Sequence, residues 1–389
     1  MRTFKNLWPK MGSLENLMGA AGEAMKGKRR KVAGAKFFGD WEKECVDLRE
    51  ELMEERYRPG PYEYFKIYEP KERRVAAAPF RDRVLHHAVV RVLEPIFEKR
   101  FLEDSFACRK GKGTHAGMRR ALNYAGKHPI ALKCDIRKYF ASIDHEILLK
   151  QLGRVVGDRR VLELCELIVG SHADGASQAW QGPVLFDVRE RRRGLPVGNL
   201  TSQFFANIYL DGLDHFIKQE LRVPGYVRYV DDFVLFGSTA KEVKEWGKRV
   251  AGYLAGLRLE LHPDKVRMCR TRDGVDFCGF VVRADGRVKV RRASVRRFAR
   301  RLKWMRWQMG RGEIRAERVT AGVRSWVAHV AHGQSWHLRA VVLAGKRGGC
   351  RRGVIEKTGR SEPGAARRLL EQQQQQLGCL EPQQQQSDE

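Results

Sequence analysis

Apolar residues recur along this chain with two different periods, one typical of helices and one typical of strands. Apolar side chains spaced three or four residues apart among charged residues predict amphipathic helices. Short runs of β-branched and aromatic residues, bounded by Gly or Pro, predict strands. The predicted helices cover 37–56 and a segment that starts near 291, and the predicted strands cover 129–136, 225–236 and 275–282. The mixture of both patterns predicts an α+β fold.

The stretch 225–236 is unusual because two adjacent acids interrupt a run of strand-forming residues. Pro224 and Gly237 lie at its ends, so we expect a β-hairpin with Asp231 and Asp232 at its tip. Two carboxylates on an apolar hairpin repel each other and lose hydration unless a cation is close. The hard cations that carboxylates favour are Mg²⁺ and Mn²⁺. The alternative is a solvated type I′ turn, in which Asp is common.

A third acid follows another short apolar run. Residues 129–136 read as a strand that places Asp135 at its end, and the residues after it read as a helix. A cap or turn role for Asp135 is the alternative. If the two strands are neighbours in an antiparallel sheet, the carboxylates of Asp135, Asp231 and Asp232 converge.

The composition indicates a polyanionic partner. The chain has 389 residues and a formal net charge of +28, with a pI of about 10.1. Nucleic acid is the expected partner, and a membrane surface is the main competitor. No run of about eighteen uncharged apolar residues exists, so a spanning helix is not expected, and the first residues lack the apolar core of a secretory signal. Scattered cysteines argue against zinc and favour a reducing cytoplasm.

A Tyr-x-Asp-Asp sequence on an apolar hairpin resembles the catalytic box of reverse transcriptases, and other stretches resemble the remaining boxes in the same order. These stretches are Lys71–Ala88, Phe101–His115, Pro129–His145, Arg193–Leu210, Gly225–Phe236 and Val275–Val282. The resemblance implies an RNA-directed DNA polymerase, a nucleotidyltransferase with a right-hand fold of fingers, antiparallel-sheet palm and short helical thumb. The expected parts are a basic arm (1–35), fingers (36–130), palm (131–282, with an insertion about 153–193), thumb (283–344) and a disordered Gln-rich tail (345–389).

The resemblance also implies a two-metal site. Asp135, Asp231 and Asp232 would be catalytic and, together with Ile136, would bind two Mg²⁺ ions, with Mn²⁺ as the alternative. Two such ions activate a primer 3′-hydroxyl and stabilise the leaving oxygen in phosphoryl transfer. We expect Asp135 and Asp231 to bridge both ions and Asp232 to support them.

Residues that resemble the nucleotide-binding positions of the family lie in several boxes. Basic side chains would hold the triphosphate, and an aromatic ring under the sugar would exclude a 2′-hydroxyl. The expected dNTP-binding residues are Arg74, Arg83, Phe140, Val197, Gly198 and Lys265. Alternatives remain open: a surface ion pair for Asp82 and Arg83, a core position for Phe140, and a turn position for Lys265.

Other basic residues are expected to contact the RNA template or the RNA/DNA duplex through phosphates. These template- and primer-binding candidates are Lys110, Lys112, Gln203, Arg296, Arg297, Arg300 and Arg301. The lysines could instead belong to a plain basic loop. The arginine-rich helix could also lie on a membrane or bind an acidic partner.

One box departs from the pattern of most reverse transcriptases. Val197 stands where glutamine is usual, and Gln203 stands where proline is usual. This pattern is similar to diversity-generating retroelement enzymes, which copy a structured template RNA, misincorporate opposite adenine and use an accessory variability determinant protein. The resemblance implies a cytoplasmic enzyme of bacterial or phage origin. A group II intron-like enzyme that assists splicing and a non-catalytic RNA-binding scaffold are the alternatives.

Overall fold

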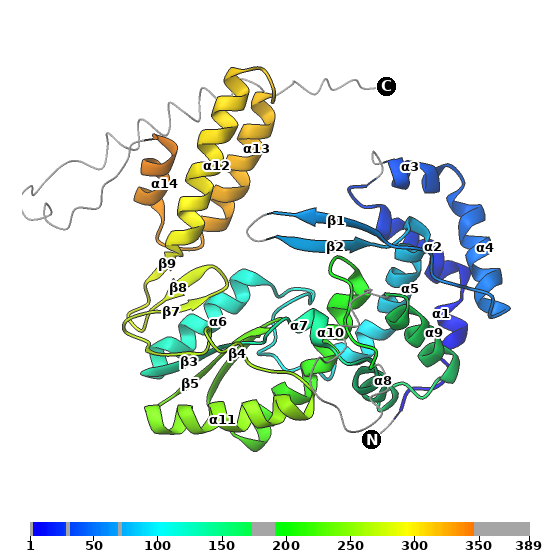
Figure 1. Ribbon diagram of the computed structural model, residues 1–389, viewed down its shortest axis with the longest axis horizontal. Coiled ribbons are helices and arrows are strands. Elements are labelled where there is room, and N and C mark those ends of the chain that lie inside the picture. The colour runs from blue at the N-terminus through cyan, green and yellow to red at the C-terminus, as the bar shows by residue number, and fades with distance from the viewer. Residues whose placement is uncertain (1–2, 29–31, 69–71, 173–190, 346–389) are drawn as a thin grey trace, which may run out of the picture. The chain divides into compact units, whose positions relative to one another are not determined.

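A computed structural model describes residues 3–28, 32–68, 72–172 and 191–345, and the strands it contains form three antiparallel sheets (Figure 1). A two-stranded sheet contains β1 (Glu63–Ile67) and β2 (Arg73–Ala77), and a three-stranded sheet contains β7 (Val275–Phe277), β8 (Phe280–Val282) and β9 (Val288–Val290). The central sheet has the order β4-β5-β3-β6, with β3 (Ile130–Asp135), β4 (Gly225–Tyr229), β5 (Asp232–Gly237) and β6 (Arg267–Arg270). The sheets and the helices between them make an α+β protein.

The helices of the described segments vary widely in length. Those before β3 are α1 (Trp8–Met11), α2 (Leu14–Met25), α3 (Val32–Gly39), α4 (Trp41–Met53), α5 (Phe80–Glu98) and α6 (Thr114–Lys127). Those between β3 and β6 are α7 (Tyr139–Ser142), α8 (His145–Gly153), α9 (Arg159–Gly170), α10 (Leu200–His215), the π-helix η1 (Phe216–Glu220) and α11 (Ala240–Gly256). The last three are α12 (Arg292–Gly310), α13 (Ala316–Val330) and α14 (Trp336–Leu343).

The central sheet has one face against α10 and α11 and the other face partly against α6. A Cβ at Gly247 of α11 would lie 2.7 Å from Leu132 Cδ2, so α11 packs closely on the face that carries Leu132. On the opposite face, the ring of Phe236 lies 5.8 Å from the ring of Tyr124 in α6. Figure 1 shows α11 and α6 on opposite sides of these strands. The central sheet is therefore covered by helices on one face and partly covered on the other.

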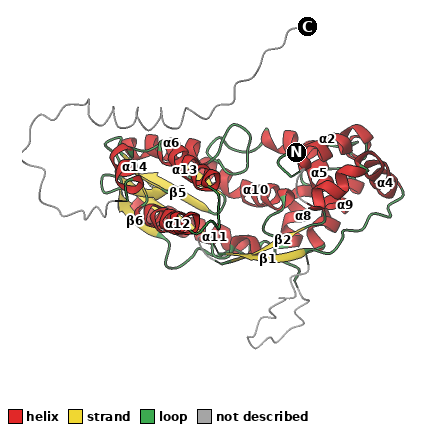
Figure 2. Cartoon of the chain, turned by 90° about the horizontal axis from the view of Figure 1, so that it is seen from above, coloured by secondary structure: helices red, strands yellow, loops and turns green. Residues whose placement is uncertain are grey.

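The N-terminal region differs from the expected basic arm. Residues 8–25 form α1 and α2, and Leu17, Ala20 and Ala21 are fully buried. Small and apolar residues recur there at helical spacing, so α2 packs closely on α5. Figures 1 and 2 both show α2 beside α5. Part of the following charge run, 29–31, lies outside the described residues.

The basic helix predicted after residue 291 is confirmed as α12. Phe298, Leu302 and Met305 are buried on one face, and Phe298 stacks on Trp326 of α13 with 4.2 Å between the ring centroids. Within the described segments, no helix has the length and apolar character needed to cross a membrane. Much of the predicted insertion (173–190) and almost all of the predicted tail (346–389) lie outside the described residues.

Candidate active site

The hairpin expected at 225–236 is confirmed as strands β4 and β5. Tyr229 pairs with Asp232, so Val230 and Asp231 form the two-residue turn between the strands. Val230 has φ of 59°, in the left-handed region that β-branched residues rarely adopt. The tip of the hairpin is therefore a strained turn that carries one acid and is followed directly by the second.

The third acid lies directly beside this tip. Asp135, the last residue of β3, pairs with Asp232 across the sheet, and Asp232 pairs in turn with Tyr229. Directly opposite residues of an antiparallel pair point to the same face, so the side chains of Asp135, Asp232 and Tyr229 form a row on one face of the sheet. The N–H of Ile136 donates a hydrogen bond of 3.2 Å to the carbonyl of Asp231, which joins the turn to β3. The structure thus brings Asp135, Asp231 and Asp232 together.

The acids affect one another's protonation. Burial raises the pKa of Asp231, and the negative charge of Asp135 raises it further. Burial raises the pKa of Asp232 to about 6; Lys133 opposes this shift, and the charges of Asp135 and Asp231 add to it. Mutual repulsion of this kind is typical of carboxylates that share one site.

Two lysines act as counter-ions to the acids. Lys265 Nζ lies 2.5 Å from Asp135 Oδ1. Lys133 Nζ lies 3.0 Å from Asp232 Oδ2 and also donates to the carbonyl of Asp276. Lys265 was a sequence candidate, whereas Lys133 was missed. Strand alternation gives the signal for it, because Lys133 is two residues before Asp135 and therefore on the same face.

The donor set fits divalent cations in its chemistry. Asp232 Oδ1 is buried and has no hydrogen-bond partner, so it remains available as a ligand atom. In the described part of the chain, no three His, Cys, Asp or Glu side chains are grouped so that they could hold a metal ion as they stand. The Ile136 side chain is buried hydrocarbon, so only its backbone could contribute. The two-metal site therefore stays a prediction.

The β1–β2 hairpin places two consecutive arginines on opposite faces. Arg74 pairs with Lys66, and its guanidinium lies 4.0 Å from the ring centroid of Tyr64. Arg73 is on the other face, and its positive charge lowers the pKa of Asp231 against the raising effect of burial. The structure therefore associates Arg73, which was missed from the sequence, with Asp231, and the nucleotide-binding role of Arg74 stays a prediction.

The other arginine candidate is engaged at a helix start. Arg83 Nε donates a hydrogen bond of 2.7 Å to the carbonyl of Ala78. Asp82 is buried and accepts hydrogen bonds from the Tyr57 hydroxyl and the Gly60 N–H, at 2.9 and 2.8 Å. The alternative of a surface ion pair between Asp82 and Arg83 is therefore wrong, because Asp82 faces inward.

The loop before α10 forms backbone hydrogen bonds to both β2 and α7, the short helix after β3. The N–H of Ala76 donates to the carbonyl of Val197, and the N–H of Leu195 donates to the carbonyl of Phe140. Gly198 has φ of 122°, and a Cβ there would lie 2.8 Å from Val75 Cγ1, so only glycine fits. Phe140 is half-buried and packs edge-on against Tyr139. Three of the expected nucleotide-binding residues, Phe140, Val197 and Gly198, therefore belong to one connected substructure.

The expected template-binding residues lie in one loop and on two helices. Lys110 forms an ion pair with Glu94, and Lys112 forms one with Glu103. The Lys112 side chain is only 13% exposed, which favours a structural role in its loop. The remaining candidates have exposed side chains; they are Gln203 on α10 and Arg296, Arg297, Arg300 and Arg301 on α12.

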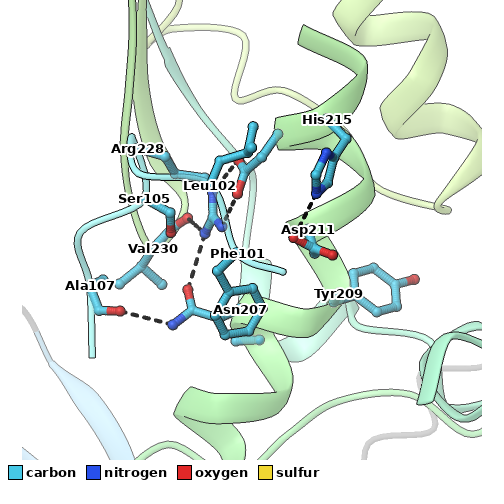
Figure 3. Close-up of polar contacts among 12 residues, drawn as sticks. Phe101, Leu102, Ser105, Ala107, Asn207, Tyr209, Asp211, His215, Arg228 and Val230 are labelled. Atoms are coloured by element: carbon cyan, nitrogen blue, oxygen red, sulfur yellow. Dashed lines mark hydrogen bonds and ion pairs between the residues drawn. The ribbon is translucent and has the colours of Figure 1, made fainter. Parts of the chain in front are cut away.

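A buried polar cluster behind the hairpin was also missed from the sequence. Arg228 of β4 and Asp214 of α10 are both fully buried and form an ion pair (Figure 3 shows Arg228 with neighbouring residues). The signal for it is a single arginine inside an apolar strand together with two aspartates, Asp211 and Asp214, inside a mostly apolar helix, because buried charges are paired.

A comparison with known proteins finds a match over the part of the chain that contains the three acids. Residues 67–282 match the family model described as reverse transcriptase (RNA-dependent DNA polymerase). This match and the antiparallel α+β architecture confirm the fold class predicted from the sequence.

Individual relatives and structures are distant. Protein YkfC of Escherichia coli (strain K12) is 26% identical over 275 residues, which are 60% of this chain and 69% of YkfC. Group II intron-encoded protein LtrA of Lactococcus lactis subsp. cremoris is 26% identical over 208 residues, which are 53% of this chain and 33% of LtrA. A telomerase structure from Candida albicans with a fragment of telomeric RNA has 14% identity and a TM-score of 0.42, covering 64% of this chain and 49% of that one.

Proposed function

Because the chain belongs to the reverse transcriptase family, we propose that it is an active RNA-directed DNA polymerase that copies a structured template RNA from deoxynucleoside triphosphates. The observation that carries this proposal is the pairing of Asp135 with Asp232 beside the turn that holds Asp231. Two carboxylates on one sheet face with a third in the adjoining turn suit phosphoryl transfer and have no structural need to be adjacent, because adjacent acids repel.

The acids and Lys265 would have different roles in the reaction. Two Mg²⁺ ions, or Mn²⁺, would when bound lower the pKa of the primer 3′-hydroxyl and stabilise the leaving oxygen. Asp135, Asp231 and Asp232 would hold the cations, with the partnerless Oδ1 of Asp232 as one ligand atom. Lys265, whose Nζ lies 2.5 Å from Asp135 Oδ1, would donate a proton to the leaving pyrophosphate.

We also propose that the chain has the three subdomains of a right-hand polymerase. We assign 36–130 to fingers, 131–282 to a palm and 283–344 to a thumb. The half-buried ring of Phe140 would lie under the sugar and exclude a 2′-hydroxyl. The exposed arginines of α12 would contact the duplex through its phosphates.

The proposal is tested by primer extension on an RNA template. We expect Asp231→Asn to lower the rate by at least about 100-fold, because a neutral amide holds a divalent cation much less strongly than a carboxylate does. Asp264→Asn is a matched control, since Asp264 is a nearby acid with an 88% exposed side chain. A folded wild-type protein that extends no primer, or an Asp231→Asn variant as active as wild type, would contradict polymerase activity and leave an RNA-binding scaffold.

Within this activity, we propose the diversity-generating type, in which synthesis in the cytoplasm of a bacterium or an infected cell is error-prone opposite adenine. Val197 supports it, because a branched alkyl group replaces an amide at a loop whose backbone bonds to β2. Such an enzyme would use an accessory variability determinant protein. Copying a defined RNA with wild type and Val197→Gln tests the idea, and equal error rates opposite adenine would refute it.

A second candidate is a group II intron-type enzyme that assists splicing. The observation that favours it is the likeness to the group II intron-encoded protein LtrA. Addition of the purified protein to an unspliced intron RNA distinguishes the two. Accelerated splicing would support this candidate, and near-repeats that differ at adenines in the neighbouring DNA would support the first.

A further inference from the structure

The ion pair behind the catalytic hairpin is fully enclosed. Arg228 Nε and Nη2 donate to the two oxygens of Asp214 at 2.7 and 2.5 Å, in the bidentate arrangement that Arg forms with carboxylates. The Tyr226 hydroxyl donates a third hydrogen bond, of 2.6 Å, to Asp214 Oδ1. Burial opposes the charge of Arg228, yet the carboxylate of Asp214 holds the Arg228 pKa above its ordinary value.

A pair of this kind is poorly explained by stability alone. Desolvation of two buried charges offsets most of their attraction, so apolar side chains of similar volume often stabilise a fold equally well. The remaining explanation is geometric: a guanidinium has five N–H groups in a fixed plane, so anchoring two of its nitrogens aims the third.

The third nitrogen points at the catalytic turn. Arg228 Nη1 donates to the carbonyl of Val230 at 3.1 Å and to Asn207 Oδ1 at 3.2 Å. Asn207 Nδ2 donates to the carbonyl of Ala107, and Figure 3 shows Asn207 between Ala107 and Arg228. The backbone of Arg228 is itself bonded to Asp104 and Phe106. Both the side chain and the backbone of Arg228 are therefore fixed by hydrogen bonds other than the one to Val230.

Val230 needs such support. Its φ of 59° is unfavourable for a β-branched residue, and strained backbone persists only where its surroundings impose it. The carbonyl that Arg228 holds belongs to the peptide unit that continues into Asp231. Fixing that carbonyl fixes the direction in which Asp231 leaves the turn.

We propose that Arg228 is a positioning residue, which uses its buried pair with Asp214 to hold the strained Val230 peptide and so to aim the Asp231 carboxylate at the site shared with Asp135 and Asp232. The inference deepens the proposed polymerase function and rests on it. The ion pair here provides geometry for the reaction rather than stability for the fold.

Arg228→Lys tests this role. Lysine keeps a positive charge beside Asp214 but has one nitrogen, which cannot bond the carboxylate and the Val230 carbonyl together in the same planar fork. Tyr226→Phe is the matched control, because it removes a hydrogen bond to the same carboxylate and leaves the contact with Val230. Two readouts are needed: hydrogen exchange of a peptide covering 229–232, and kcat with the Kd for a primer–template duplex.

We expect Arg228→Lys to speed exchange at 229–232 by about tenfold and to lower kcat by about 10- to 100-fold, with an unchanged duplex Kd, since small displacements of a reacting group have effects of this size. Tyr226→Phe should change neither readout at the turn. Glycine accepts a positive φ without strain, so the kcat loss from Arg228→Lys should be smaller when Val230→Gly is also present.

A second variant covers a failure of Arg228→Lys to fold. The triple variant Tyr226→Phe, Asp214→Leu and Arg228→Met replaces the whole buried group with apolar side chains and is expected to fold. Wild-type exchange at 229–232 and wild-type kcat, in either folded variant, would overturn the proposal. If wild type extends no primer, the proposed function fails, while the exchange comparison still decides whether Arg228 holds the turn.

Discussion

Arg73 and Arg74 offer a direct test of how the β1–β2 hairpin faces the incoming nucleotide. The pairing of Phe65 with Val75 and of Lys66 with Arg74 fixes the two faces of this hairpin. Val75 contacts Gly198 in the loop before α10, and Arg73 shares the face of Val75. We therefore expect Arg73 to bind the triphosphate and Arg74 to act within the hairpin.

The expected magnitudes differ enough to measure. A charge-assisted hydrogen bond to phosphate is worth about 1.5–3 kcal/mol, or about 10- to 150-fold in kcat/KM. Arg73 is exposed, so Arg73→Ala should lie near the lower end, at about tenfold, mainly through a higher KM for the dNTP. Arg74→Ala removes a guanidinium 4.0 Å above the Tyr64 ring, worth at most about 1 kcal/mol at an exposed site, or about fivefold.

Steady-state incorporation of a single dNTP measures both effects. Arg73→Lys should be intermediate, because it keeps the charge and loses the bidentate geometry. The reasoning would be refuted by a greater loss in Arg74→Ala than in Arg73→Ala, or by a change in duplex affinity without a change in the KM for the dNTP.

Three further predictions concern single side chains around the site. Phe140→Ala should admit ribonucleotides, and single-ribonucleotide incorporation checks this; unchanged sugar discrimination would dispose of the idea. Lys133→Met removes the cation 3.0 Å from Asp232, so in EDTA the free energy of unfolding should fall by about 1–3 kcal/mol in urea titrations. Burial lowers the pKa of His115, and the neighbouring His332 and His329 lower it further. The unfolded chain therefore binds a proton at this residue more readily than the folded chain does. The free energy of unfolding accordingly has its full value above about pH 6.5 and falls as the pH drops below it. His115→Phe should make thermal unfolding less pH-dependent between about pH 7 and 5, whereas an unchanged dependence would contradict this.

The sequence predicted the features that depend on local pattern. Alternating strand-forming residues around Asp231 and Asp232 sufficed for the hairpin, and an apolar run ending at Asp135 sufficed for the neighbouring strand. These predictions are confirmed because strand propensity and turn residues act over a few positions. That these two strands are neighbours was a condition of the predicted convergence of the acids, and the pairing of β3 with β5 fulfils it.

Features that depend on register or on distant partners could not be read in the same way. Which of Arg73 and Arg74 faces the acids depends on a one-residue choice of register, which moves every side chain to the other face. The partnership of Arg228 with Asp214 joins a strand to a helix, and neither residue alone identifies the other. The N-terminal helices were missed because a nearby run of lysines and arginines dominated the composition of residues 1–35.

Three unfavourable features coincide at the tip of one hairpin. Val230 has a strained backbone, Asp231 is half-buried near Asp135, and Asp232 has a buried oxygen without a partner. Each would be relieved by one substitution, such as glycine in the turn or asparagine in place of an acid. Immediately behind them, the oxygens of Asp214 and all three guanidinium nitrogens of Arg228 are bonded. A strained turn beside a fully hydrogen-bonded ion pair is expected where the geometry of the turn is needed for a reaction. A fold that required only stability would retain neither the strained turn nor the buried ion pair.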